Sequence, residues 1–204
     1  MKRIVLAMTC AFGLVASAAT PALAAKKFRA PEGFTLKQNG ELIHNKSETR
    51  FPLVYEGFAR TNNFGFDADG KNIAVVYKYT TPAKQVVEVR IALVHILMMS
   101  AHEHFAALAP IMKNYFPDLG LRGVTHESDG AIAVKGMKDG SAWQGRFQAV
   151  RSPRVPYVMS LTTVDLGYWS ARIIAAYPEA LKTDAQARIA GLIDKINEHG
   201  PQHP

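Results

Sequence analysis

The stretch QVVEVRIALVHIL, residues 85–97, decides how this chain folds. Every second residue from Val87 to Leu93 is apolar, which predicts a β-strand with one buried face. From Ile91 onward both faces are apolar, as in a strand that is covered on both sides. We therefore expect residues 85–97 to form a central strand of a sheet.

Further segments rich in β-branched and aromatic residues lie on both sides of this stretch. Asn39-Gly40 predicts a hairpin within 34–44, and Asp69-Gly70 predicts a tight turn after a strand at 53–60. Because the connections are short, neighbouring strands are expected to be antiparallel. The other expected strands are 73–80, 124–127, 131–137, 142–150, 155–166 and 168–177.

Two helices are expected to interrupt the strands. The first begins at Ser100, where Glu103 three residues later completes a capping-box pattern. Pro110 cannot donate a backbone hydrogen bond, so it is expected to kink this helix or to divide it into 101–108 and 110–116.

The second helix is expected to start at Thr183, with Gln186 in the matching capping-box position, and to cover 184–197. Its apolar residues recur at helical spacing. The predicted fold class is therefore α+β: a mostly antiparallel sheet of about 6–8 strands. Two main helices, around 101–116 and 184–197, are expected to flank this sheet.

The first residues of the chain have the regions of a secretory signal peptide. Residues 2 and 3 are basic, residues 4–19 are apolar, and small residues lead up to Ala24. The alternative is a transmembrane anchor, but the apolar run is shorter than the ~20 residues that span a bilayer. We expect a signal peptide over 1–24, cleaved near Ala24, and a periplasmic or secreted protein.

Residues 25–204 have the length of one domain, and no repeat, low-complexity tract or linker divides them. We expect a single α+β domain there, with flexible ends at 26–33 and 198–204. The only cysteine of the chain, Cys10, lies in the expected signal peptide. The mature protein would then have no thiol, which excludes disulfides, thiolate metal sites and cysteine nucleophiles.

The basic residues of the chain are spread widely. There are 24 Lys and Arg and 17 Asp and Glu, and loss of Lys2 and Arg3 with the leader leaves a net charge of +5. Proteins that bind nucleic acid concentrate basic residues on one face or arm, and here no block is longer than Lys26-Lys27. We expect no nucleic-acid partner, and at most peripheral contact with a membrane or the cell envelope.

One segment combines imidazole and thioether side chains, and it predicts a candidate copper or zinc site at His95, Met98, His102 and His104. Helical geometry weakens this interpretation, because His102 and His104 would lie roughly 200° apart around the helix. His95 is otherwise interpreted as a core histidine, and Met98 as filling a gap between strand and helix. Without this site, no cofactor is expected.

Catalytic residues are not predicted. His44, His126, Glu127 and Asp129 are acid–base candidates, but no spacing places two of them together, since adjacent residues on a strand point to opposite faces. A hydrolase would require two of them to converge. The chain also lacks a nucleophile elbow, a phosphate-binding loop, a dinucleotide-binding motif and a zinc-protease motif.

Most aromatic residues lie in expected strands and are explained by packing. Phe64 and Phe66 are different, because they fall in a turn-rich stretch, 62–70, between two expected strands. Exposed aromatic side chains on a loop indicate contact with a partner. We therefore predict Phe64 and Phe66, with the sheet edge beside them, as the partner-contact residues.

The strand YWSARII (168–174) continues through Tyr177-Pro178 into the helix at 184–197. Together with the exported, cysteine-free character, this order resembles the exported PsbP/DcrB-like domains of the Mog1/PsbP fold. The resemblance implies an antiparallel sheet flanked by helices, and an accessory or binding protein of unassigned role. It implies no functional residue.

The function expected from the sequence is that of an exported, non-enzymatic domain that binds a partner protein or a small ligand. The alternative is a periplasmic copper- or zinc-binding protein that uses the segment from His95 to His104. The identity of the ligand and the oligomeric state are not predicted.

Overall fold

A computed structural model describes residues 30, 32–96, 98–151 and 154–198. The signal peptide and cleavage site expected at 1–24 therefore lie outside the described residues, as does most of each end expected to be flexible. Within the part that is described, no helix is long and apolar enough to cross a membrane.

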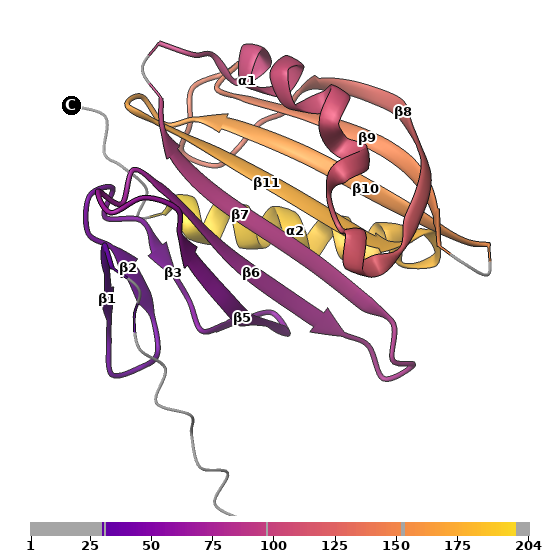
Figure 1. Cartoon of the computed structure of the whole chain (residues 1–204), viewed down its shortest axis with the longest axis horizontal. Coiled ribbons are helices and arrows are strands. Elements are labelled where there is room, and N and C mark those ends of the chain that lie inside the picture. The colour runs from indigo at the N-terminus through magenta and orange to yellow at the C-terminus, as the bar shows by residue number, and fades with distance from the viewer. Residues whose placement is uncertain (1–29, 31, 97, 152–153, 199–204) are drawn as a thin grey trace, which may run out of the picture.

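The main sheet has eight strands in the order β4-β5-β6-β7-β11-β10-β9-β8, and all neighbours are antiparallel (Figure 1). This confirms the predicted α+β class. The strands are β4 (Val54–Tyr55), β5 (Phe58–Gly65), β6 (Asn72–Thr80), β7 (Val86–His95), β8 (Leu121–Ala131), β9 (Ala142–Arg151), β10 (Val155–Asp165) and β11 (Trp169–Pro178).

The stretch with alternating apolar residues from Val87 to Leu93 lies in β7, between β6 and β11. Val87, Val89, Ile91 and Leu93 are almost fully buried on one face, as their alternation predicts. Ala92 is buried on the other face, opposite Ala74 of β6 and Arg172 of β11. The prediction of a central strand is confirmed.

A second, three-stranded sheet comprises β1 (Phe34–Leu36), β2 (Leu42–His44) and β3 (Arg50–Phe51). The hairpin predicted at Asn39-Gly40 joins β1 and β2. Gly40 has a φ of 80°, a conformation that glycine adopts without strain. The Asn39 side chain accepts a hydrogen bond from the Glu41 amide, which stabilises the turn.

The strand expected at 53–60 is two strands. Glu56-Gly57 form a tight turn between β4 and β5, both with positive φ. β5 then continues to Gly65, so Phe64 lies on a strand and not in a loop, while Phe66 follows directly after it. The expected 62–70 loop is therefore shorter, because β6 pairs with β5 as far as Gly65.

The strand expected at 124–127 is part of a longer strand, and the prediction of a separate strand at 131–137 is wrong. Residues 121–131 form the single strand β8, and Ser128-Asp129-Gly130 continue it without turning. The long neighbour β9 supplies backbone partners past Gly130, which pairs with Gln144. Two bulges, one of them between His126 and Ser128, bend β8 and keep it in register.

Helix α1 (Ala101–Leu108) starts with the predicted capping box, since Ser100 and Glu103 bond each other's backbone amides. After Leu108 the chain continues as the 3₁₀ helices η1 (Ala109–Asn114) and η2 (Pro117–Leu119). Pro110 divides the expected helix as predicted, but the second part is 3₁₀ and not α, because proline removes one backbone donor.

Helix α2 (Lys182–Asn197) follows a short 3₁₀ turn, η3 (Glu179–Leu181). The capping box expected at Thr183 is absent, and the N-cap is Leu181, without a side-chain bond. The helix already starts before Thr183, so that residue lies inside its first turn. Packing stabilises this helix, through the buried Ala185, Ile189, Leu192, Ile193 and Ile196.

The helices lie on opposite faces of the main sheet (Figure 1). Helix α2 and the small sheet pack with the face that carries Val89 and Ile173. Helix α1 packs on the other face with Phe147, Met159 and Ile174. The protein thus has two apolar clusters, one on each side of the sheet.

Candidate functional site

The α1 face of the main sheet is covered over only part of its width. Helix α1 lies on β9 and β10, and η1 lies beside β8. Over β5, β6, β7 and β11 the face is hollowed to a volume of about 360 Å³. The small side chains of Ala74 and Ala92 form the floor, and Tyr115 and Asp118 from the η1–η2 segment form one wall. We call this the sheet hollow.

Phe64 and Phe66 line the sheet hollow on the β5 side. Their rings stack with centroids 6.1 Å apart and an interplanar angle of 18°. Phe64 is 43% exposed and Phe66 57% exposed. Two large apolar rings are thus presented to solvent side by side, as in a contact surface.

The edge of β5 beside these rings is open. β4 pairs only with Phe58 and Ala59, and the last backbone bond on this side joins Arg60 N to Leu53 O. From Thr61 to Gly65, no other described strand pairs with this edge. An open edge of this kind is a template for an added strand.

Charged side chains line the hollow next to the rings. Glu88 is buried, and its carboxylate pairs with Lys78 at 2.9 Å and with Arg90 at 2.7 Å. Arg90 also bonds Asp118 at 3.0 Å. The carboxylates of Glu88 and Asp118 therefore neutralise two basic side chains. Arg172 is the third basic residue that lines the hollow.

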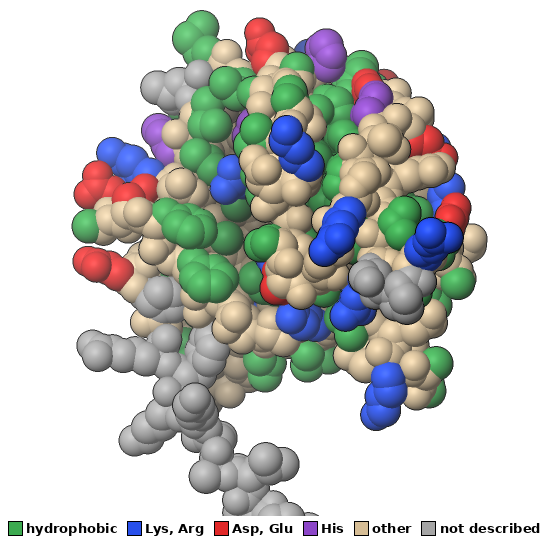
Figure 2. Space-filling model, turned by 45° about the vertical axis from the view of Figure 1, so that its right-hand side comes forward, with side chains coloured by type: hydrophobic (Ala, Val, Ile, Leu, Met, Phe, Trp, Pro, Cys, Tyr) green, Lys and Arg blue, Asp and Glu red, His purple; other side chains and the backbone are tan. Residues whose placement is uncertain are grey.

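Arg172 extends into the hollow from β11 and has no ion pair or hydrogen bond with a described residue. It lowers the pKa of His104, although burial is the larger cause of that shift. An anionic group in the hollow would therefore find a cation that the protein leaves uncompensated. Figure 2 shows Lys and Arg side chains across the middle of this side, among hydrophobic ones, and acidic side chains mostly near the margin.

The predicted metal ligands have separate partners. His104 is only 4% exposed, and its Nδ1 lies 2.5 Å from the Ser170 hydroxyl. The His102 ring packs on Trp143, with centroids 4.4 Å apart. Among the described residues, no three His, Cys, Asp or Glu side chains form a group that could hold a metal ion. Copper or zinc binding by this segment is the alternative that the sequence predicts, and these separate contacts do not favour it.

The other two predicted metal ligands, His95 and Met98, do not pack as the sequence predicts. His95 is exposed at the end of β7 and packs edge-on against Trp169, so it is not a core histidine. Met98 is 99% exposed and fills no gap. The reason is that β7 ends at His95, so both side chains lie beyond the covered part of the strand.

The sequence did not predict the pairing of His126 and Asp129. Their Nε2 and Oδ2 atoms lie 2.9 Å apart, because the bulge after His126 places both side chains on one face. The other Asp129 oxygen accepts a bond from Trp143 Nε1 at 2.9 Å. Among the described residues, no hydroxyl bonds to the His126 ring.

His44, the remaining acid–base candidate, is fully buried. Its ring nitrogens bond the Ser47 hydroxyl at 2.7 Å and the Gly70 carbonyl at 2.8 Å. Burial lowers the pKa of this imidazole. His44 therefore joins the small sheet to the turn before β6, and it does not converge with His126 or Asp129 in the cavities described here.

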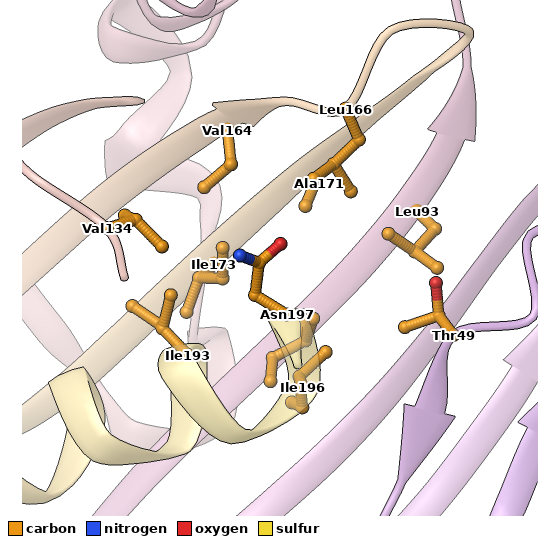
Figure 3. Close-up of a pocket in the computed structure, with 11 residues that line it drawn as sticks. Thr49, Leu93, Val134, Val164, Leu166, Ala171, Ile173, Ile193, Ile196 and Asn197 are labelled. Carbon is orange, nitrogen blue, oxygen red and sulfur yellow. The ribbon is translucent and has the colours of Figure 1, made fainter. Parts of the chain in front are cut away.

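Figure 3 shows an apolar cavity between α2 and the sheet. Its volume is about 20 Å³, which is room for one water molecule. Its walls are almost entirely aliphatic, and Asn197 and Thr49 are the polar residues on its lining. A cavity of this size cannot hold a ligand.

No family model matches this chain, and no curated protein matches it in sequence. Among solved structures, the chain is similar to the Saccharomyces cerevisiae Ran-binding protein Mog1p. The likeness covers 81% of this chain and 92% of that chain, with 9% identity and a TM-score of 0.43. The resemblance expected from the sequence was to the Mog1/PsbP fold; the finer assignment to exported PsbP/DcrB-like domains stays a prediction.

Proposed function

We propose that this protein binds a partner protein, and that an extended segment of the partner pairs with the open edge of β5. The observation that carries the proposal is the exposed stack of Phe64 and Phe66 beside that edge. Backbone bonds from Thr61 to Gly65 would hold the segment, and the two rings would contact its side chains.

The charge in the sheet hollow indicates which kind of partner would bind there. Arg172 lies in the same hollow as the two rings and is not balanced by a carboxylate. Apolar side chains of the paired segment would contact Phe64, and an acidic side chain would come near Arg172 where the partner continues from this segment across the hollow. Complementary charge of this kind sets specificity and speeds association.

A photo-crosslinking amino acid at position 66, introduced into the full chain in its host, would identify the partner. Binding of the purified partner is then measured for the wild-type protein and for Phe64→Ala/Phe66→Ala. We expect the double variant to lose at least tenfold in affinity, because aromatic anchors carry much of the energy of an interface.

Val150 and Val155 supply the matched control, since they are exposed to a similar extent at the neighbouring ends of β9 and β10, outside the sheet hollow. The variant Val150→Ala/Val155→Ala should bind as the wild-type protein does. Arg172→Glu should weaken binding further by repelling the acidic residue. Unchanged affinity in the double phenylalanine variant would overturn the proposal.

We also propose that the protein is exported and works in the periplasm or outside the cell. The support is the pattern of residues 1–24 and the absence of cysteine after Cys10. Fractionation of cells that express the full chain, with mass spectrometry of the recovered protein, tests this. A chain that starts near Ala25 in the periplasm is expected, and an uncleaved chain in the cytoplasm would contradict export.

A further inference from the structure

A second, larger cavity lies on the opposite face of the sheet, between α2 and strands β9, β10 and β11. Its volume is about 460 Å³, within the range of small-molecule sites. It is separate from the sheet hollow, because the sheet itself lies between them. Val134 and Ile193 stand between this cavity and the small apolar one and line both (Figure 3).

Polar side chains converge on the sheet side of this cavity. Arg146 of β9 lies opposite Ser160 of β10, and Gln144 and Tyr177 lie on the same face of the sheet. The face that packs under a helix is normally apolar. These four polar side chains under α2 therefore differ from the apolar residues that otherwise lie between α2 and the sheet.

Arg146 is only partly satisfied. Its Nε and Nη2 atoms donate to the Ser128 hydroxyl at 3.3 and 3.2 Å. Among the described residues, no carboxylate lies within ion-pair distance of its guanidinium, and the Nη1 atom makes no hydrogen bond. A half-buried guanidinium with unused donors can bind an anion with two oxygens through two parallel hydrogen bonds.

The Tyr177 hydroxyl is the second unsatisfied group. Tyr177 is fully buried, and its oxygen has no hydrogen-bond partner of good geometry within the described part of the chain. Burial raises the pKa of this phenol, so it stays protonated and can donate. The side chains of Gln186 and Ser160 approach this hydroxyl and partly offset the rise in its pKa. A buried hydroxyl without a partner destabilises the protein, and a bound acceptor would relieve this cost.

The α2 side of the cavity is mostly apolar. Ile189, Ala190 and Ile193 face the polar groups across the cavity, together with Ile132. Asp194 lies at the rim, where its carboxylate accepts a bond from the Lys135 amide. The cavity therefore has a cationic, hydrogen-bonding side and an aliphatic side.

We propose that this cavity binds a small organic carboxylate with an apolar body. The carboxylate accepts hydrogen bonds from Arg146 and from the Tyr177 hydroxyl, and the apolar body packs against Ile189 and Ile193. This ligand site is independent of the partner surface on the other face. If no carboxylate binds in this cavity, the proposed partner binding at β5 is unaffected. If no partner binds at β5, the carboxylate site is unaffected.

Isothermal titration calorimetry with butanoate, hexanoate, octanoate and phenylacetate tests the site, with hexanamide as the uncharged counterpart. At least one of these carboxylates should bind in a one-to-one ratio, and hexanamide should bind at least tenfold more weakly than hexanoate. Absence of saturable binding for the whole series would overturn the proposal.

Two variants separate this site from nonspecific binding. Arg146→Gln should weaken carboxylate binding at least tenfold, and Tyr177→Phe several-fold. Tyr177→Phe keeps the ring and removes only an unsatisfied hydroxyl, so the protein should fold at least as stably. Arg151→Gln, on the same strand but outside the cavity, is the control and should bind normally. Carboxylate binding that both cavity variants retain in full would contradict the assignment.

Discussion

The ring of Phe105 in α1 lies directly against the backbone of Gly145 in β9, so closely that a methyl group at position 145 would collide with it. This contact holds α1 over β9 and β10. Over β5 to β7, the described residues leave the sheet hollow open, and the η1–η2 segment reaches only its wall through Tyr115 and Asp118. The close approach at Gly145 thus helps to determine where the sheet hollow lies.

Gly145→Ala is expected to destabilise the protein by about 1–3 kcal/mol, because the added methyl group overpacks the contact with Phe105. Urea unfolding followed by circular dichroism measures the change. Gly130→Ala is the control: a methyl group there meets nothing within 4 Å, and its φ is not positive. Equal effects of the two substitutions would show that Phe105 does not restrict position 145.

Ser100→Ala is expected to cost about 1 kcal/mol of unfolding free energy, because it removes the hydrogen bond to the Glu103 amide and the capping box of α1. Thr183→Ala provides the matched test at α2. Its hydroxyl does not cap that helix, so this substitution should be nearly neutral. A larger loss from Thr183→Ala than from Ser100→Ala would contradict the observed caps.

The free energy of unfolding should decrease as the pH is lowered below about 6.5. The reason is that burial lowers the pKa of His44 and His104 below 6.5 in the folded protein. Between the lowered pKa values and 6.5, the unfolded chain binds more protons, so low pH favours unfolding. Above this range both imidazoles are neutral in the folded and the unfolded protein, so they do not make the free energy of unfolding depend on pH.

His104→Asn tests this linkage, since asparagine can still bond the Ser170 hydroxyl but does not titrate. Urea unfolding at several pH values between 5 and 8 should give a smaller slope in the variant. Each histidine can contribute at most about 1.4 kcal/mol per pH unit. An identical slope in the wild-type protein and the variant would show that His104 does not contribute.

Calorimetric titration with Cu(I), Cu(II) and Zn(II) tests the alternative metal-binding function. We expect no tight one-to-one binding, because His104 is buried on Ser170 while His95 and His102 pack on different tryptophans. Tight binding that His95→Asn and His102→Asn both weaken would contradict this expectation and would support a metal-binding protein.

The sequence predicts most of the fold, because alternation and turn residues act locally. β7, the Asn39-Gly40 hairpin and the capping box at Ser100 all follow from such local patterns. The predictions are wrong where a strand that is distant in the sequence determines the local structure. Ser128-Asp129-Gly130 have turn composition, yet β9 holds them in a strand.

The candidate sites depend still more on distant contacts. Phe64 and Phe66 could be singled out as unexplained aromatic residues, but the hollow beside them needs Arg172, more than a hundred residues away. The His126–Asp129 pair depends on a bulge that no residue pattern predicted. Arg146 and Tyr177 meet only because β9 and β11 both flank β10.

Hydrogen–deuterium exchange of the backbone amides measures directly whether a partner segment pairs with the open edge of β5. With the crosslinked partner identified and added in excess, the exchange of residues 61–65 should slow markedly, while that of the opposite edge strand β8 should not change. Phe64→Ala/Phe66→Ala should abolish this protection. Unchanged exchange at residues 61–65 in the saturated complex would contradict strand pairing at β5.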